Sequence, residues 1–574
     1  MYPPAHRFWP WVPVFSSATT YSRNDNTTVH HTTERTPSNG TTMETTSRGT
    51  TVKKSSSGRA PATTTSGLNI PLHNFWPLVP LDAPNDVKIH KINNNFLLPT
   101  HNFWPFIPIS DVTPPIRPPT RPPVLPPIIP PRRPWPPSTN RYNYGEVLYK
   151  SILFFEVQRS GWLPENRKIS WRSHSATEDQ GYYGEDLTGG WYDSGDYIKF
   201  GLPMAAATSM LLWGLVEYGA AYKSTGLMDD MLDCVRWSLD YFLKAHTEKF
   251  VFYGQVGDPY IDHAYWGRPE DMDMTRPAYK LTPESPGSDL IAETAAAMAA
   301  GYLAFRDIDP TYAQTMLAHA KELYEFADNF RGRYSDTIDN AVEFYGSSSD
   351  EDELAWAAVW LYRATGNRYY LNRAQYWFRL ASSCWAQSWA DKSCGVSVLL
   401  YKLTKDRKYK SIIESTFAQW LPGGHVHYTP KGLAFRSDWG TLRYTANMVF
   451  VSLVAADLNV QPSTYRAWAR RQMHYMLGDS GRSYVVGYGY RFPTRPHHAS
   501  SSCRSPPHPC TWADYTKLES NAHILYGALV GGPDSEDNYL DERDDYIHNE
   551  VGCEYNGGFQ SAIAGLKFLE MHAI

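Results

Sequence analysis

Residues 288–305 read SDLIAETAAAMAAGYLAF, and this stretch indicates how the chain folds. Its apolar residues recur at spacings of three and four, which is the period of an α-helix. A face of small side chains lets a neighbouring helix approach closely; it consists of Ala292, Ala295, Ala296, Ala299 and Ala300. The stretch therefore predicts a helix that packs closely against other helices.

The same periodicity recurs on both sides of this stretch, from about residue 142 onward. Longer helices are predicted at 204–221, 227–245, 310–330, 351–365, 368–381, 441–458 and 463–477, and shorter ones at 144–158, 395–403, 409–419, 522–529 and 557–571. Because these helices are accompanied by few convincing strands, the predicted fold class is all-α. A closed double ring of helices accommodates this number, but periodicity alone does not distinguish it from an irregular helical bundle.

The composition of the whole chain indicates a large folded region and favours a neutral or sugar-like ligand. Of 574 residues, 42% are hydrophobic, which is enough for at least one large core. The net charge of −5 gives no indication of a nucleic-acid or anionic-membrane partner. No window approaches the roughly 18 apolar residues of a membrane span. The first residues have neither the basic nor the apolar region of a signal peptide.

The first 139 residues differ from the rest in composition, which predicts a domain boundary at residue 140. They contain 26 of the 43 prolines, whereas all six cysteines follow them. Between residues 16 and 66, 25 of 51 residues are serine or threonine and few are apolar, so a disordered spacer is predicted. Paired prolines at 114–137 favour a semi-rigid polyproline II segment. The folded domain is expected to span residues 140–574.

Three copies of one motif lie in this N-terminal region, at residues 6–14, 73–81 and 101–109. Each copy reads His-x-Phe-Trp-Pro, followed by two apolar residues, a proline and another apolar residue. The aromatic rings suit stacking on sugars or on a protein, so one interpretation is an adhesive segment that binds a polysaccharide or matrix partner. The other interpretation is duplicated low-complexity sequence without a defined ligand.

Two acidic stretches carry the candidate chemistry. Asp193 and Asp196 stand three residues apart in a glycine-rich turn, and residues 541–550 contain five carboxylates in ten positions. Crowded carboxylates raise one another's pKa. Hydrolysis of a glycosidic bond needs such a division of roles, with one protonated acid and one ionised base. Taken alone, either stretch also fits a solvated loop or a set of calcium ligands.

Longer motifs decide between these interpretations, because residues 142–574 resemble glycoside hydrolase family 9, the inverting endo-β-1,4-glucanases. The motifs follow the family's order: NYGE at 143–146, GWYDSGD at 190–196, RPEDM at 268–272, PGSD at 286–289, WGTLRY at 439–444, RPHH at 495–498 and YIHNE at 546–550. They look most like those of the animal enzymes of termites, crustaceans and molluscs. The resemblance implies an (α/α)6 barrel whose open cleft binds a β-glucan chain, no required cofactor, and secretion.

The resemblance also implies roles for individual residues. Asp196 would be the general base that holds the attacking water, Asp193 its partner and Glu550 the general acid. His497 would lie near the cleaved bond, and Asp541 would support Glu550. Cleft positions that contact glucosyl units would be His263, Trp266, Tyr345, Trp385, Trp439, Arg443, Tyr444 and Tyr555. Aromatic rings suit this task, because one face of a sugar is apolar and its rim is polar.

Some positions depart from the family's pattern. Ala499 stands where the family usually has an arginine after the two histidines, so a guanidinium expected to hold the sugar next to the cleaved bond is absent. Tyr197 replaces a frequent histidine after the paired aspartates. A charged donor that acts in the transition state contributes strongly to the rate, so weak activity or an altered substrate preference is an alternative.

A structural calcium ion is a further expectation from the resemblance. Family members often bind calcium beside a serine-rich acidic loop, and residues 347–353 form such a loop here. Asp352 and Glu353 would supply the side-chain ligands. The alternative is an acidic helix start with a serine N-cap.

The cysteines indicate disulfides rather than a zinc site. Cys503 and Cys510 enclose a proline-rich stretch that suits a loop disulfide, and Cys384 with Cys394 is a plausible second pair. The remaining two, Cys234 and Cys553, are expected to be free or buried as small apolar residues.

Three functions fit the sequence, and a secreted, active endo-β-1,4-glucanase fits best. The second is a carbohydrate-binding or matrix protein on the same barrel, with catalysis weakened or lost, for which Ala499 and the N-terminal repeats are the supporting features. The third is a hydrolase of another β-glycan, such as mixed-linkage glucan or a glucosamine polymer.

Overall fold

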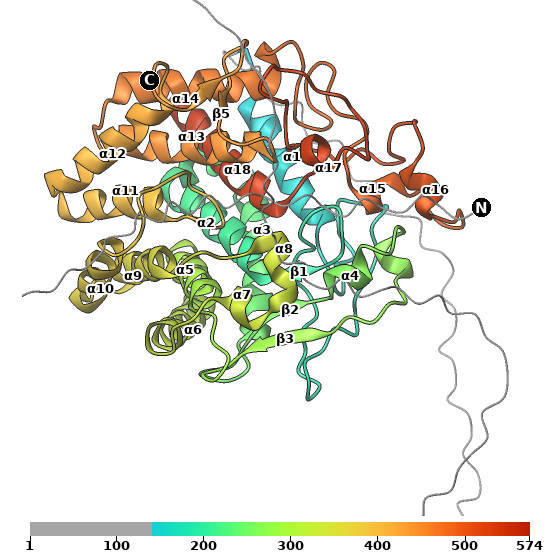
Figure 1. Ribbon diagram of the computed structural model, residues 1–574, viewed down its shortest axis with the longest axis horizontal. Coiled ribbons are helices and arrows are strands. Elements are labelled where there is room, and N and C mark those ends of the chain that lie inside the picture. Colours follow the sequence, from blue (N-terminus) through green and yellow to red (C-terminus); the bar gives the residue numbers. More distant parts are fainter. Residues whose placement is uncertain (1–140, 574) are drawn as a thin grey trace, which may run out of the picture. The chain divides into compact units, whose positions relative to one another are not determined.

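The computed structural model describes residues 141–573 of the chain (Figure 1). The predictions for residues 1–139, namely the disordered spacer, the polyproline segment and the three aromatic repeats, lie outside the described residues. The domain boundary at residue 140 also stays a prediction.

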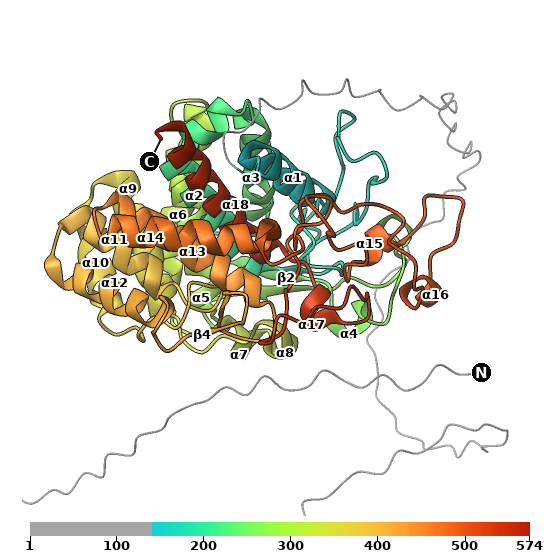
Figure 2. The ribbon, with the colours of Figure 1, turned by 90° about the horizontal axis from the view of Figure 1, so that it is seen from above.

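Six long helices are buried on nearly all sides and form an inner ring. They are α2 (Gly201–Ser224), α5 (Ser288–Phe305), α9 (Glu351–Thr365), α11 (Ser393–Thr404), α13 (Thr441–Asp457) and α18 (Cys553–Met571). Each contacts the next in this order, and α18 packs against α2, so the ring is closed. Figures 1 and 2 show α18 between α13 and α2, which joins the end of the domain to its beginning.

Six further helices alternate with these along the chain and cover the ring from outside. They are α1 (Tyr144–Val157), α3 (Met228–Ala245), α6 (Pro310–Asn329), α10 (Arg368–Phe378), α12 (Arg407–Trp420) and α14 (Pro462–His474). α3, for example, buries one face through Met231, Val235 and Phe242 and leaves its acidic residues outside. The all-α prediction is confirmed, and the contacts form the double ring of an (α/α)6 barrel rather than an irregular bundle.

The alanine-rich sequence of residues 288–305 explains why α5 lies in the inner ring. All five alanines of its small-residue face are completely buried. Gly301 on the same helix packs so close to α3 that an added Cβ would lie 3.0 Å from the Leu239 side chain. Short side chains therefore let α5 approach its neighbours in the ring and in the outer layer.

Strands and short helices form the connections. A three-stranded antiparallel sheet has the order β1 (Lys199–Phe200), β2 (Phe252–Val256), β3 (Ala278–Leu281), with Phe200 opposite Gln255. A second, two-stranded sheet pairs β4 (His427–Tyr428) with β5 (Ala434–Phe435). The short helices are α4 (Pro259–Asp262), α7 (Tyr334–Thr337), α8 (Val342–Tyr345), α15 (Ala499–Ser502), α16 (Trp512–Tyr515) and α17 (Tyr546–Asn549), the 3-10 turns η1 (Pro269–Asp271) and η2 (Asp339–Ala341), and the π-turn η3 (Tyr475–Asp479).

One predicted helix is wrong: residues 522–529 form an irregular loop. Its backbone amides bond to other segments instead of to residues four positions earlier, as His523 N–H to the Ser501 carbonyl and Gly527 N–H to the Val486 carbonyl show, both at 2.9 Å. Gly527 has a φ of +82°, and a Cβ there would collide with the Lys150 carbonyl of α1. The apolar residues of this loop thus serve packing between segments rather than one face of a helix.

Several inner helices begin after a loop that carries predicted site residues. Asp193 and Asp196 precede α2, Trp439 precedes α13, and Glu550 precedes α18. Because inner and outer helices alternate, all inner helices start at the same end of the barrel. In Figures 1 and 2 the short helices α4, α15, α16 and α17 gather at one side of the long helices.

Both expected disulfides are present, Cys384–Cys394 and Cys503–Cys510, while Cys234 and Cys553 are free and buried. Within residues 141–573, none of the helices combines the length and apolarity that a membrane crossing requires.

Candidate active site

The loop that holds Asp193 and Asp196 is joined to two segments far away in the sequence. The Gly195 carbonyl accepts the Ala499 N–H at 3.0 Å, and the Asp193 carbonyl accepts the Cys553 N–H at 2.9 Å. A Cβ on Gly195 would lie 2.3 Å from the His497 carbonyl oxygen, so only glycine allows this approach. The 193–196 turn, the 497–499 segment and the start of α18 therefore form one rigid junction.

The Asp193 carboxyl is buried and held by hydroxyl donors. Tyr345 donates its hydroxyl to Asp193 Oδ2, and Ser194 Oγ donates to the same oxygen at 3.2 Å. Burial raises the pKa of Asp193 to about 8, with the charges of Glu554 and Glu550 acting in the same direction against the hydrogen bonds. Burial thus favours the protonated form of Asp193, whereas the two hydroxyl donors favour its carboxylate.

Asp196 is more accessible and lies beside a second aspartate that the sequence analysis did not single out. Burial and the nearby charges of Asp262 and Asp193 raise the pKa of Asp196 well above its ordinary value. Asp262 Oδ1 accepts the Tyr197 N–H at 3.2 Å, and burial raises its pKa to about 7. One side-chain atom each of Asp196, Asp262 and His263 lies within 4.8 Å of the others. The only sequence signal for Asp262 was its place next to His263.

Glu550 faces this acidic group from the loop before α18. Trp439 Nε1 donates to Glu550 Oε2 at 2.7 Å, and the Tyr555 hydroxyl donates to the same oxygen at 2.6 Å. Burial raises the pKa of Glu550. Because both donors use Oε2, Oε1 is the oxygen left to carry a proton. The arrangement suits a neutral carboxylic acid that gives up this proton to a partner.

His497 is held by hydrogen bonds to the last residue of α17 and to the segment before α17. Its backbone N–H bonds to the Asn549 carbonyl at 2.9 Å, next to Glu550, and Nδ1 lies 2.7 Å from the Arg543 carbonyl. Because the Arg543 carbonyl can only accept, Nδ1 is the donor nitrogen, and burial lowers the pKa of His497 to about 4, which favours the neutral ring. Nε2 is then the acceptor nitrogen of the ring.

Asp541 lies one step further from the acidic group. Its two carboxyl oxygens accept the backbone N–H groups of Thr494 and Arg495 at 2.8 and 2.9 Å. These contacts fix the loop that leads to His497, so Asp541 acts on the position of His497. Its predicted support of Glu550 stays a prediction.

The predicted cleft residues divide by exposure. Tyr345 and Tyr555 are buried and bond to acidic side chains, and Arg443 forms a buried ion pair with Glu554 beneath the ring of Tyr444. Trp385 is the exposed residue of this set, with 42% of its surface accessible, and its ring meets Tyr444 edge-on at 5.0 Å.

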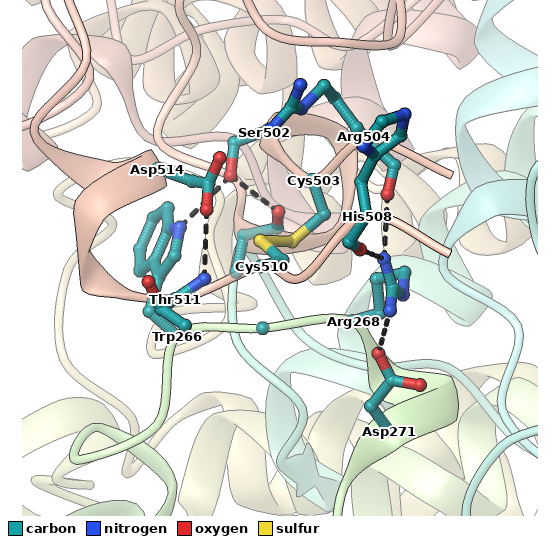
Figure 3. Close-up of a disulfide and its surroundings, with 12 residues drawn as sticks. Trp266, Arg268, Asp271, Ser502, Cys503, Arg504, His508, Cys510, Thr511 and Asp514 are labelled. Carbon is teal, nitrogen blue, oxygen red and sulfur yellow. Dashed lines mark hydrogen bonds and ion pairs between the residues drawn. A yellow bond between two sulfur atoms is a disulfide. The ribbon is translucent and has the colours of Figure 1, made fainter. Parts of the chain in front are cut away.

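On the other side of the acidic group the predicted residues are His263 and Trp266. His263 is partly exposed, with Nδ1 2.6 Å from the Pro259 carbonyl. Trp266 is only 7% exposed, and its indole N–H donates to Ser502 Oγ at 3.0 Å (Figure 3). Its ring meets His497 edge-on at 5.4 Å. Both residues therefore border the junction between Asp196 and His497.

Ala499 is buried in a small apolar cluster. It is 2% exposed and packs with Tyr192, Tyr197 and Trp266. The two departures from the family's pattern, Tyr197 and Ala499, thus belong to the same cluster, in which a large ring accompanies a small side chain.

The two residues expected to bind calcium have protein partners. Asp352 accepts hydrogen bonds from Ser349 Oγ at 2.9 Å and from the Lys392 N–H at 2.7 Å. Glu353 faces the Lys392 ammonium at 3.4 Å, and Glu293 of α5 faces it at 3.5 Å. These contacts fit an internal ammonium better than a calcium ion shared by the two carboxylates. The calcium site stays a prediction, and nothing below depends on it.

Comparison with known proteins places this arrangement in a family. The family model described as Glycosyl hydrolase family 9 matches residues 144–563. Endoglucanase 4 of Bacillus sp. (strain KSM-522) is 45% identical over 436 residues, which cover 73% of this chain and 68% of the relative. Endoglucanase 6 of Arabidopsis thaliana is 39% identical over 477 residues, which cover 75% of this chain and 76% of the relative.

Solved structures give the same result. The endoglucanase from the termite Nasutitermes takasagoensis is 50% identical, with a TM-score of 0.73, and the match covers 75% of this chain and all of the termite chain. The endoglucanase CelQ from Clostridium thermocellum, solved in complex with cellotetraose, is 36% identical, with a TM-score of 0.67 over 74% of this chain and 71% of that one.

Proposed function

The chain belongs to glycosyl hydrolase family 9 and is a glycoside hydrolase of the cellulase type, and from this premise we propose a specific reaction. It cleaves internal β-1,4-glucosidic bonds of cellulose or a related β-glucan with inversion at the anomeric carbon. Glu550 is the general acid and Asp196 the general base. The cellotetraose bound to the Clostridium thermocellum relative supports a cello-oligosaccharide as the bound form.

The observation that carries the proposal is the environment of Glu550 opposite the paired aspartates. An inverting hydrolase needs a protonated carboxyl at the leaving oxygen and a carboxylate that activates water on the other face of the sugar. Glu550 has a raised pKa and a free Oε1, which suits the donor. Asp196 is the more accessible of the two aspartates in the 193–196 turn, which suits contact with water.

The like charges around Asp196 strengthen it as a base. A carboxylate crowded by Asp193 and Asp262 gains more by taking a proton than an isolated one does. A base works best when its pKa lies near the working pH. Asp193 is fixed by Tyr345 and Ser194, so it shapes the field around Asp196 while Asp196 takes the proton of the attacking water.

Neutral His497 completes the site beside the reacting bond. Its Nε2 accepts a hydrogen bond from a sugar hydroxyl, and its low pKa keeps it uncharged at the pH where Glu550 must hold a proton. A cationic ring there would favour loss of the Glu550 proton.

We also infer that the protein acts outside the cell. The two disulfides favour an oxidising compartment, and a polymeric substrate is met outside the cell. The N-terminal repeats would then bind a polysaccharide or matrix partner near the substrate, which stays a proposal without structural support.

The test is release of reducing sugar from carboxymethylcellulose and mixed-linkage glucan by the full chain and by Glu550→Gln. We expect activity in the parent and a loss of at least a hundredfold in the variant, because the amide has no proton to give. Glu536→Gln, an exposed neighbour outside the site, is the matched control and should behave as the parent. Proton NMR of the first product should show the α-anomer, as inversion requires.

Each alternative function has its own outcome in this test. A parent that binds cellulose but releases no sugar would identify a binding or matrix protein on the barrel. Cleavage of mixed-linkage glucan or a glucosamine polymer without cleavage of carboxymethylcellulose would identify a hydrolase of another β-glycan.

A further inference from the structure

A loop closed by a disulfide lies against the site and is held at several points (Figure 3). Cys503 and Cys510 join the two ends of residues 503–510. Arg268 Nη1 donates to the carbonyls of Arg504 at 2.8 Å and His508 at 2.6 Å, while its Nη2 pairs with Asp271. This loop, called the disulfide loop below, is therefore fixed by the disulfide and by one guanidinium.

The residues that follow the disulfide loop are equally fixed. α16 begins with a capping box, in which Thr511 Oγ1 accepts the Ala513 N–H at 3.3 Å and Asp514 accepts the Thr511 N–H at 2.9 Å. The Trp512 indole N–H donates to the Ala264 carbonyl at 3.1 Å. Trp512 is nevertheless 36% exposed. A large aromatic ring is thus presented to solvent in a preset orientation.

Trp512 lies at the end of a row of aromatic rings that starts at the general acid. Trp439, bonded to Glu550, is 5.5 Å from Tyr546, and Tyr546 is 6.1 Å from His497. The row continues from His497 to Trp266 at 5.4 Å and from Trp266 to Trp512 at 5.7 Å.

Trp512 and Tyr515 are the accessible members at this end of the row. Trp266 is almost fully buried, and Tyr515 covers it edge-on at 4.8 Å. Tyr515 also meets the ring of Trp512 at 5.3 Å and that of His497 at 6.0 Å. A ligand that approaches from solvent therefore meets Trp512 and Tyr515 before it meets Trp266.

We propose that Trp512 and Tyr515 form an outer platform that binds a glucosyl unit of the β-glucan chain on the far side of Trp266 from His497, beyond the units that contact His497 itself. The inference rests on the proposed function and extends it to the length of chain that the enzyme holds. The apolar face of a glucosyl ring stacks on the Trp512 indole, and the Tyr515 hydroxyl is near its polar rim. Because the disulfide loop fixes the platform beforehand, little conformational entropy is lost on binding.

The test compares a short and a long ligand in the Glu550→Gln background, where no substrate is consumed. Isothermal titration with cellotriose and cellohexaose gives both dissociation constants. Trp512→Ala should weaken cellohexaose binding about tenfold, the effect of one aromatic contact. Its effect on cellotriose, which fits the central positions alone, should be much smaller. Trp512→Phe should retain most of the cellohexaose affinity.

Two further variants separate the platform from a general loss of structure. Tyr369→Ala removes an aromatic ring that is 51% exposed on the outer helix α10, and it should leave both affinities as in the parent. Cys503→Ser with Cys510→Ser frees the disulfide loop, and it should weaken cellohexaose more than cellotriose.

The outcomes also distinguish this inference from the proposed function. If the parent hydrolyses cellulose and Trp512→Ala changes both affinities equally or neither, the platform is wrong and the hydrolase stands. If the parent hydrolyses no glucan, the titrations in the Glu550→Gln background still decide whether Trp512 binds long chains. A third outcome would also overturn the platform. If Trp512→Ala loses all binding and has an unfolded circular dichroism spectrum, while Trp512→Phe retains both affinities, Trp512 serves stability rather than binding.

Discussion

Two groups of buried or partly buried carboxylates lie among the N-terminal ends of the inner helices, and they differ in whether a cation accompanies them. The central group consists of Glu293, Glu353 and Lys392, in which an ammonium stands between two carboxylates. The acidic group consists of Asp193, Asp196, Asp262 and Glu550. No lysine or arginine forms an ion pair with any of these four among residues 141–573.

The difference shows how a buried charge serves stability in one place and reactivity in another. In the central group, burial raises the pKa values of Glu293 and Glu353 as well, but the ammonium of Lys392 acts against that rise, and the glutamates in turn hold the pKa of Lys392 above its ordinary value despite burial. In the acidic group, burial and like charges raise the pKa values of Asp193 and Asp196. A carboxyl group whose pKa is raised toward the working pH is poised for proton transfer.

The largest effect is expected from Asp196→Asn. The amide removes the base but keeps the shape of the side chain, so kcat on carboxymethylcellulose should fall about 10⁴-fold, equivalent to about 5.5 kcal/mol in the barrier. The melting temperature should not fall, because a like charge has been removed. Asp307→Asn, whose side chain is 86% exposed on a loop, is the control. A variant with near-normal kcat would remove Asp196 from the role of base.

Whereas Asp196→Asn reduces the activity of the protein, Lys392→Met should reduce its stability. It leaves Glu293 and Glu353 buried without their cation, which costs about 4 kcal/mol of unfolding free energy. Urea unfolding measures this loss, and Lys410→Met, in a surface pair, should change stability by less than about 0.5 kcal/mol. Adding Glu353→Gln should recover part of the loss. If Lys392→Met is as stable as the parent, the central group contributes nothing to the fold.

Ala499→Arg introduces into the acidic group the cation that it lacks. Ala499 is buried and bonded to Gly195, so the larger side chain should cost about 2 kcal/mol of stability. A guanidinium there lowers the pKa of Asp196. The base then stays ionised to lower pH, and the acid limb of the kcat profile should move to lower pH. A rise in kcat would indicate that the parent is weakened by the missing arginine, and an unmoved limb would place the guanidinium away from Asp196.

The smallest effect concerns the stability of the parent between pH 6.5 and about 8. Asp193 has a higher pKa folded than unfolded, so its protonation favours the folded state at lower pH, and this advantage is lost as pH rises toward about 8. Below 6.5 the depressed pKa values of His497 and His498 act in the opposite direction. The melting temperature should therefore fall across this window. Asp193→Asn should flatten the fall and add about 1 kcal/mol at its upper end; an unchanged slope would contradict the assignment.

The inner helices and most of the site were predictable, for different physical reasons. Small residues at helical spacing in 288–305 indicated a helix packed on several sides. The paired aspartates and Glu550 stood in long motifs of one family. The closure of the ring depends on contacts between α2 and α18, which are hundreds of residues apart, and periodicity carries no information on such contacts.

The missed residues are those whose role depends on neighbours distant in sequence. Asp262 joins the acidic group because α4 lies beside the 193–196 turn. The orientation of the exposed Trp512 ring is set by the hydrogen bond from its indole N–H to the Ala264 carbonyl. Lys392 has no signal in its own segment, because the two carboxylates that face its ammonium, those of Glu293 and Glu353, lie on α5 and α9. The false helix at 522–529 has the right composition, but Gly527 lies against the Lys150 carbonyl.

The closing of the ring by α18 has a consequence for how the protein is made. A ribosome releases the chain from its N-terminus, so the turn with Asp193 and Asp196 emerges long before the segment with Glu550 and α18. Until α18 inserts between α13 and α2, the nascent chain has Asp193 and Asp196 in place but lacks Glu550, and its inner ring of helices is not yet closed. Catalytic competence therefore arrives in a single late step of biosynthesis, together with completion of the fold.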